Sequence, residues 1–240
     1  MKLLLENWRE FLKEGIDPRI QKQIDNLFAL PEVSLNPESA KPLPANVAVG
    51  IDLHGGSDQI TVFYCLIHKE SGKFARRTSK EDTGIPHGLV IAVSPDEHPW
   101  EPGFPETMPP CLNGFTIAST KATRGWGPLL YEVVLEWTSQ EGRAGLMADR
   151  RGVSDYAVAV WDKYLDRGDV DKKQLDIDPE GAEQFNTQHL TPDDPEDDCS
   201  QKSAVRRGGS DGWQDTSISK LYNKPNAEAM SALGARLVIV

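Results

Sequence analysis

The chain has few cysteines and no long apolar run, and each absence excludes a class of protein. The three cysteines, Cys65, Cys111 and Cys199, are odd in number and show no C-x-x-C spacing. This pattern predicts neither a disulfide framework nor a zinc site, and it favours a reducing cytoplasm. No stretch approaches the roughly 18 to 20 consecutive apolar residues that a membrane span requires. The opening MKLLLENWRE carries charges where a secretory signal needs an apolar centre, so we expect a soluble, unsecreted protein.

Positive charge is also in short supply. The 240 residues include 26 lysines and arginines against 37 aspartates and glutamates, which gives a formal net charge of −11 at pH 7. Such a chain is repelled by the phosphate backbone that supplies most non-specific nucleic-acid affinity, so nucleic-acid binding is disfavoured. With 38% hydrophobic residues, the length suits one large globular domain or one domain with an appended arm.

Two amphipathic helices are predicted at the N-terminus. Apolar residues recur with helical spacing over residues 2–14, and again from Pro18 to just before Pro31. We expect a helical hairpin and a proline-rich linker over residues 1–44, followed by one domain over residues 45–240. The aromatic side chains of the hairpin would either pack its two helices together or form a docking surface for another protein.

A β-rich region follows the linker. Apolar runs of strand type lie at residues 47–53, 59–68, 89–94 and 115–120. The glycines Gly55 and Gly56 are expected to join the first two runs as a hairpin. Residues 95–110 contain six prolines, so they predict an irregular excursion that could cover a cleft.

The apolar period then changes from two to 3.6. Helix, strand, helix, helix and buried strand are predicted at residues 128–140, 145–148, 155–166, 225–233 and 237–240. Ser154 is the expected cap of the second helix. Residues 169–219 are polar and acidic, so we expect a long, largely irregular acidic loop. The acidic cluster at 193–198 lacks the EF-hand pattern and is interrupted by Pro195, which favours a solvated loop over a calcium site.

Residues 114–131 form a β run that breaks into a glycine-bearing turn and opens a helix. The first N–H groups of a helix lack intrahelical partners and attract anions, while Gly125 and Gly127 would let a phosphate approach the backbone. Lys121 and Arg124 add positive charge. Many strand-to-helix turns need glycine only for tight packing, so an anion site and a purely structural turn both remain open.

The order strand, turn, helix, strand, helix resembles the Gcn5-related N-acetyltransferase (GNAT) family over about residues 114–165. The family's turn pattern is Arg/Gln-x-x-Gly-x-Gly/Ala; residues 122–127, ATRGWG, keep both glycines but place Ala122 at the basic position. A later family motif, Asn-x-x-Ala-x-x-x-Tyr-Glu-Lys, is approached by residues 154–163, SDYAVAVWDK, where Trp161 replaces the tyrosine.

The resemblance implies an α/β (α+β) fold, with a mixed central sheet flanked by helices. It also implies that acetyl-CoA is bound without a metal, that its thioester lies along residues 117–120, and that its acetyl group passes to a small-molecule or protein amine. The implied acetyl-CoA-binding residues are Ile117, Ser119, Thr120, Lys121, Arg124, Gly125, Trp126 and Gly127.

The same resemblance leaves the catalytic groups open. The family's tyrosine protonates the departing thiolate, which the indole of Trp161 cannot do near neutral pH. Tyr164 lies one helical turn further on and would either reach that position or belong to the core. His54 would be either a general base or an exposed turn residue. Glu132 and Glu136 are expected to be solvated.

Two functional classes therefore remain. The intact Gly125 and Gly127 favour an acetyltransferase, whereas Ala122 and Trp161 favour a catalytically inactive structural or interaction protein, with the N-terminal hairpin as its partner surface. The opening MKLLLENWREFL resembles uncharacterised proteins of tailed bacteriophages. This resemblance implies either a virion component or a protein of the host cytoplasm.

Overall fold

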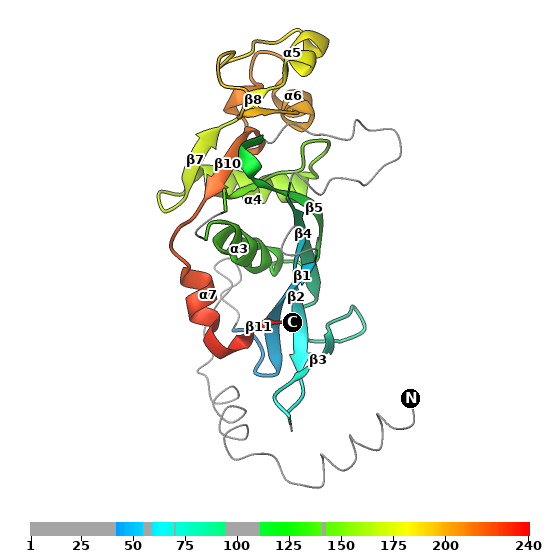
Figure 1. Cartoon of the computed structure of the whole chain (residues 1–240). Helices are drawn as coiled ribbons and strands as arrows, with labels where there is room; N and C mark the ends of the chain where they lie inside the picture. The colour runs from blue at the N-terminus through cyan, green and yellow to red at the C-terminus, as the bar shows by residue number, and fades with distance from the viewer. Residues whose placement is uncertain (1–41, 55–58, 70, 95–110, 141–142) are drawn as a thin grey trace, which may run out of the picture.

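The computed structural model describes residues 42–54, 59–69, 71–94, 111–140 and 143–240. The predicted N-terminal hairpin with its docking surface, the Gly55-Gly56 turn and the 95–110 excursion lie outside these residues. The described chain is a mixed α/β structure with helices packed on a curled sheet (Figure 1). None of its helices is long and apolar enough to cross a membrane.

Nine strands form the central sheet (Figure 1). They are β1 (Val47–His54), β2 (Gln59–Ile67), β3 (Phe74–Arg77), β4 (Gly88–Val93), β5 (Phe115–Ala122), β6 (Leu146–Met147), β7 (Asp171–Gln174), β10 (Lys220–Asn223) and β11 (Leu237–Ile239). Their order is β11-β1-β2-β4-β5-β6-β10-β7, with β3 paired to the end of β2. β1, β2, β4 and β5 form an antiparallel meander, whereas β5 pairs with β6 in parallel. The four strands expected between residues 47 and 120 are thus confirmed, with ends that differ by one or two residues.

Some helices pack on this sheet, and others lie beyond one of its ends (Figure 1). They are α3 (Gly127–Thr138), α4 (Asp155–Asp166), α5 (Pro179–Phe185), α6 (Lys202–Gly208) and α7 (Glu228–Leu233). α3 contacts β2, β4 and β5, and its side chains Leu130, Val133 and Val134 are fully buried. The helix predicted at 155–166 is confirmed, and the Ser154 side chain caps it by accepting the Ala157 N–H at 3.3 Å.

The segment predicted as an acidic loop, residues 169–219, is folded, so that prediction was wrong. Besides β7, α5 and α6 it contains the two-stranded parallel sheet of β8 (Asp176–Ile177) and β9 (Asp198–Cys199). It also holds the 3₁₀ turns η4 (Trp213–Asp215) and η5 (Ser217–Ser219). Trp213 and Ile218 are each 1% exposed in the main core. A few large buried side chains thus anchor a segment whose average composition is polar.

Cys111 and Cys199 form a disulfide across 88 residues, with their Cα atoms 5.1 Å apart. The expectation that the cysteines form no disulfide framework was therefore wrong, and the argument for a reducing compartment loses its basis. The pair lies in a small apolar cluster with Met147, Leu175 and Leu221. Sequence spacing could not reveal the pairing, because the contact is created by the packing of β9 and the residues before it beside the 3₁₀ turn η3 (Cys111–Asn113), which precedes β5.

The expectation that Glu132 and Glu136 are solvated was also wrong. Glu136 is 0% exposed, and the Lys224 ammonium donates to Glu136 at 2.7 Å and to Glu132 at 2.6 Å. Glu136 also accepts the backbone N–H groups of Ala229 and Met230 in the first turn of α7. The connection from β10 to α7 covers this face of α3, which helical periodicity alone could not indicate.

The C-terminal strand was expected to be buried, and this was a further error. β11 pairs only with β1, in parallel, so it is an edge strand among the described residues. Ile239 is 61% exposed. Leu237 and Val238 are only partly buried, each against a different apolar cluster, so the apolar run at the C-terminus supports strand pairing without full burial.

Candidate functional site

A cleft with a volume of about 740 Å³ opens where β5 ends. It is bounded by the β5–α3 turn, the first turns of α3 and one face of α4. Its lining consists of Thr120, Lys121, Ala122, Thr123, Arg124, Gly125, Gly127, Pro128, Tyr131, Ser154, Tyr156, Ala157, Ala159, Val160 and Lys163. The cleft therefore lies at the turn that the sequence marked as an anion site.

The cleft exists because two parallel strands separate. β5 pairs with β6 only through Phe115 and Thr116. It then continues to Ala122, and no described strand pairs with it on that side. A bulge at Ala118 also breaks the register between β5 and β4. Peptide groups on the open side of β5 are therefore available to an extended ligand.

The turn itself has a fixed conformation. Gly125 has a φ of +83°, a left-handed value that favours glycine. Trp126 turns inward, where its carbonyl accepts the Tyr64 hydroxyl at 2.8 Å and its ring meets the Tyr64 ring edge-on at 5.8 Å. α3 starts without a side-chain cap, and Pro128 in its first turn has no N–H. The backbone N–H groups at the start of α3 therefore have no side-chain cap and can donate to a ligand.

A second set of contacts joins this turn to β4. The Thr123 N–H donates to the His87 carbonyl at 2.8 Å, and the His87 N–H donates to the Thr123 hydroxyl at 3.0 Å. The Trp126 N–H in turn donates to the Thr123 carbonyl at 2.9 Å. These bonds hold the turn in one position relative to the sheet before any ligand binds.

Electrostatically, the cleft differs from the rest of the chain. Lys121, Arg124 and Lys163 line it, and none of the lining residues that the structure describes is an aspartate or glutamate. The chain as a whole carries a net charge of −11. Local positive charge at a helix N-terminus favours a ligand that bears phosphate groups.

The residues that the sequence assigned to acetyl-CoA binding divide into two groups. Thr120, Lys121, Arg124, Gly125 and Gly127 line the cleft. Ile117 and Trp126 are buried at 6% and 8% exposure, Ser119 is exposed, and none of these three lines it. Of the residues assigned to acetyl-CoA binding, those at the end of β5 and in the following turn therefore face the cleft.

Tyr164, one of two predicted catalytic residues, is in the core. It is 3% exposed, and its ring packs against Trp161 and Tyr222 with centroids 5.9 Å and 6.0 Å away. Burial raises the pKa of Tyr164 well above its ordinary value, and the charge of Glu132 raises it further. The sequence allowed either a catalytic or a core role for Tyr164, and the structure places it in the core.

His54, the other predicted catalytic residue, lies away from the cleft. The register of the sheet shows this. His54 pairs with Gln59 on β2, and Gln59 pairs with Val93 on β4. Val93 pairs with Thr116, near the start of β5. The cleft is at the other end of β5. The His54 side chain is 52% exposed, with Nε2 3.2 Å from a carboxylate oxygen of Asp52.

Tyr131 is a cleft residue that the sequence analysis missed. It lies one helical turn after Gly127, and its hydroxyl is 3.0 Å from the Thr120 hydroxyl at the end of β5. Burial raises the pKa of Tyr131, so the phenol is protonated at neutral pH and can donate a hydrogen bond. The spacing of four residues from Gly127 was the available signal, because residues i and i+4 share one helical face.

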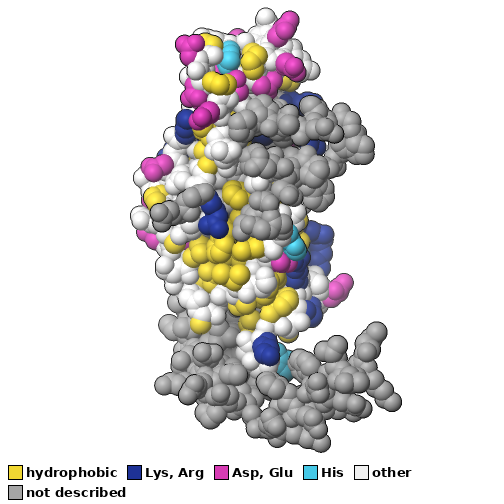
Figure 2. All heavy atoms as spheres, in the orientation of Figure 1, with side chains coloured by type: hydrophobic (Ala, Val, Ile, Leu, Met, Phe, Trp, Pro, Cys, Tyr) yellow, Lys and Arg dark blue, Asp and Glu magenta, His cyan; other side chains and the backbone are white. Residues whose placement is uncertain are grey.

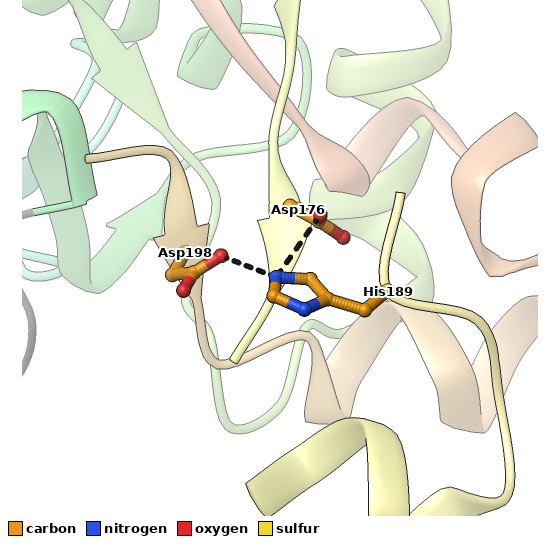
Figure 3. A group of neighbouring side chains, drawn as sticks. All are labelled: Asp176, His189 and Asp198. Atoms are coloured by element: carbon orange, nitrogen blue, oxygen red, sulfur yellow. Dashed lines mark hydrogen bonds and ion pairs between the residues drawn. The ribbon is translucent and has the colours of Figure 1, made fainter. Parts of the chain in front are cut away.

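Among the described residues, the cleft lining does not provide a set of metal ligands, since it includes no carboxylate or imidazole. In the described chain, one group of aspartate and histidine side chains has the compactness of a metal site. It consists of Asp176, His189 and Asp198 at the β8–β9 sheet (Figure 3).

Comparison with known proteins adds no assignment to this geometry. No protein-family model, curated protein or solved structure matches the chain.

Proposed function

We propose that this chain is an acyl-CoA-dependent N-acyltransferase of the GNAT type, with acetyl-CoA as the donor. The observation that carries the proposal is the cleft at the start of α3, whose described lining combines three cationic side chains, no carboxylate and a fixed two-glycine turn. A diphosphate bound there would accept hydrogen bonds from the turn and gain from the helix dipole. Lys121, Arg124 and Lys163 would offset its negative charge.

The sheet also supports an extended thioester arm. Beyond Thr116, β5 has an open side, and the bulge at Ala118 removes one residue from pairing with β4. An arm that runs from the turn along β5 would meet unpaired peptide groups, which can hold a thioester carbonyl in place. The mixed sheet flanked by helices, in which β5 pairs in parallel with β6 and then continues with no described strand on that side, supports this proposal, because the resemblance implies a sheet of that general kind.

Within this proposal, Tyr131 replaces Tyr164 as the proton donor to the departing sulfur. Tyr131 lines the cleft and is held by Thr120 at 3.0 Å, whereas Tyr164 is enclosed by aromatic rings. Bound acetyl-CoA supplies the activated acetyl group, and the chain's own groups position it and protonate the leaving thiol. The amine acceptor is expected to enter with its nitrogen already deprotonated or to lose its proton to water, since the described residues that line the cleft include no carboxylate or imidazole.

Calorimetry with coenzyme A and acetyl-CoA tests the binding step. The variant Gly127→Glu should abolish binding, because it puts bulk and negative charge where the phosphates would sit. Among the described residues, an added Cβ at Gly127 would have one neighbour within 4 Å, the Ala122 Cβ at 3.7 Å, so the variant should fold. Gly168→Glu is the matched control, since nothing lies within 4 Å of an added Cβ there and the residue does not line the cleft. Absence of heat with the unmutated protein would reject the proposal.

A second candidate function is a structural or interaction protein that has the same fold but does not transfer acyl groups. Trp161 at the family's tyrosine position favours it, because that indole is 1% exposed in the core and cannot act as an acid. Release of free thiol from acetyl-CoA, followed with a panel of small amines and lysine peptides, separates the two candidates. Transfer that Tyr131→Phe slows while binding is retained supports the enzyme, and binding without transfer supports the second candidate.

A further inference from the structure

Two aspartates lie beside one histidine near β8 (Figure 3), at the end of the molecule that carries β8 and α5 (Figure 1). Figure 2 shows acidic side chains gathered at this end. β8 and β9 are parallel, and their register places Asp176 opposite Asp198. His189 enters from the loop after α5, and its Nε2 lies 2.8 Å from Asp198 Oδ1 and 3.3 Å from Asp176 Oδ2. The three ligand atoms lie within 4.8 Å of one another.

Cations of the described residues balance the charge of this group only in part. Asp176, Asp197 and Asp198 are 1%, 5% and 7% exposed. In the part of the chain that the structure describes, no lysine or arginine lies within ion-pair distance of these carboxylates; His189 contacts Asp176 and Asp198, and Lys173 acts on Asp197 only from a greater distance. Buried carboxylates need a counter-charge, and an imidazole supplies at most one. A dication would supply two.

The surrounding bonds hold the ligand atoms in place. Asp176 Oδ1 accepts the N–H groups of Ile177 at 2.7 Å and Leu190 at 2.9 Å. Its Oδ2 accepts the backbone N–H and the hydroxyl of Thr191, the latter at 3.0 Å. These donors fix the carboxylate and tie the histidine loop to β8. Metal ligands in proteins are oriented by outer contacts of this kind.

We propose that Asp176, His189 and Asp198 bind a first-row divalent metal ion, with Zn²⁺ as the expected occupant. One imidazole nitrogen and two carboxylate oxygens suit Zn²⁺, whereas Ca²⁺ and Mg²⁺ favour all-oxygen sets. Neighbouring ligand atoms around tetrahedral Zn²⁺ are about 3.3 Å apart, given Zn–N and Zn–O bonds of about 2.0–2.2 Å. The ion would take the place of the proton between Nε2 and the two carboxylates. His189 is partly exposed, so the ion and a coordinating water can enter from solvent.

Such an ion would fasten a polar segment that has little core of its own. It would join β8, β9 and the loop at 189–191, and Asp198 directly precedes Cys199 of the disulfide. The metal and the disulfide would then cross-link the segment at adjacent positions, as is common where apolar burial is limited. The sequence patterns predicted no metal here, because the acidic cluster at 193–198 lacks the EF-hand pattern and the cysteines lack zinc-site spacing.

Binding is tested on the untagged full chain after treatment with a chelator. Equilibrium dialysis should give one Zn²⁺ per chain, and Co²⁺ should give visible absorption typical of nitrogen and oxygen ligands. Excess Ca²⁺ should not displace either ion. Zn²⁺ should also raise the thermal unfolding midpoint. Absence of Zn²⁺ and Co²⁺ binding by the unmutated chain would overturn the proposal, and so would a Co²⁺ spectrum dominated by thiolate charge transfer.

The variants His189→Gln and Asp198→Asn locate the site. Each should weaken Zn²⁺ binding by at least about 10-fold, because even loss of an outer contact typically costs that much. His54→Gln is the matched control, since His54 also lies beside an aspartate, at 3.2 Å, but with a single carboxylate. Binding that survives in both site variants would place the ion elsewhere and overturn the assignment. Circular dichroism of each variant checks that it is folded.

Discussion

At the scale of single residues, the two glycines of the turn differ in backbone conformation. Gly125 has a φ of +83°, whereas Gly127 lies in ordinary helical backbone at the start of α3. A side chain at a left-handed position costs about 1–2 kcal/mol. The next residue, Trp126, contacts Tyr64 in the core, so the conformation of Gly125 belongs to a packed turn.

We therefore expect Gly125→Ala to lower the free energy of unfolding by about 1–2 kcal/mol. Gly127→Ala should leave it nearly unchanged, because an added Cβ there meets only the Ala122 Cβ at 3.7 Å. Urea denaturation of the two variants beside the unmutated protein checks this difference. Equal effects of the two substitutions would contradict the left-handed turn.

At the scale of secondary-structure elements, a charged network joins α3, β10 and the end of α4. The Arg167 guanidinium donates to both carboxylate oxygens of Glu132, at 2.7 Å and 2.8 Å, and Lys224 donates to Glu132 as well. Burial alone would raise the pKa of Glu132, but these two cations outweigh burial and lower it below 4.5. A carboxyl group with a lowered pKa in the folded state stabilises the fold when it is ionised.

The stabilisation from Glu132 should be fully present above about pH 4.5 and lost as the pH falls through the lowered pKa. Glu132→Gln should therefore lower the free energy of unfolding by roughly 1.5–3 kcal/mol at pH 7, because it removes hydrogen bonds to charged groups. The difference between the variant and the unmutated protein should shrink at acid pH. Urea midpoints measured at several pH values check this, and a difference independent of pH would contradict the role of ionised Glu132.

At the scale of the whole molecule, the Cys111–Cys199 disulfide fastens the segment 169–219 to the start of β5. A cross-link across 88 residues removes much of the freedom of the unfolded chain. We expect reduction to lower the stability by about 2–4 kcal/mol and to lower the thermal midpoint. Thiol titration in denaturant should find one free cysteine before reduction and three afterwards. Three thiols before reduction would show that the bond does not form.

The order of strands and helices was largely predictable because it depends on local patterns. The alternation from Val47 to Ala122 and the cap at Ser154 lie within each element, so the sequence located the meander and α4. The roles of Tyr131 and His54 were not predictable in this way. They depend on how β1, β2, β4 and β5 align, which places the histidine level with one end of β5 and the tyrosine at the other.

The sequence by itself determined the glycine turn at the start of α3 and the elements around it, because dihedral preferences and apolar periods act over a few residues. Only the tertiary structure decided the burial of Glu136, the pairing of Cys111 with Cys199 and the meeting of His189 with two aspartates. These contacts join residues from separate elements, and a polar side chain is buried or exposed according to the partners that the fold supplies.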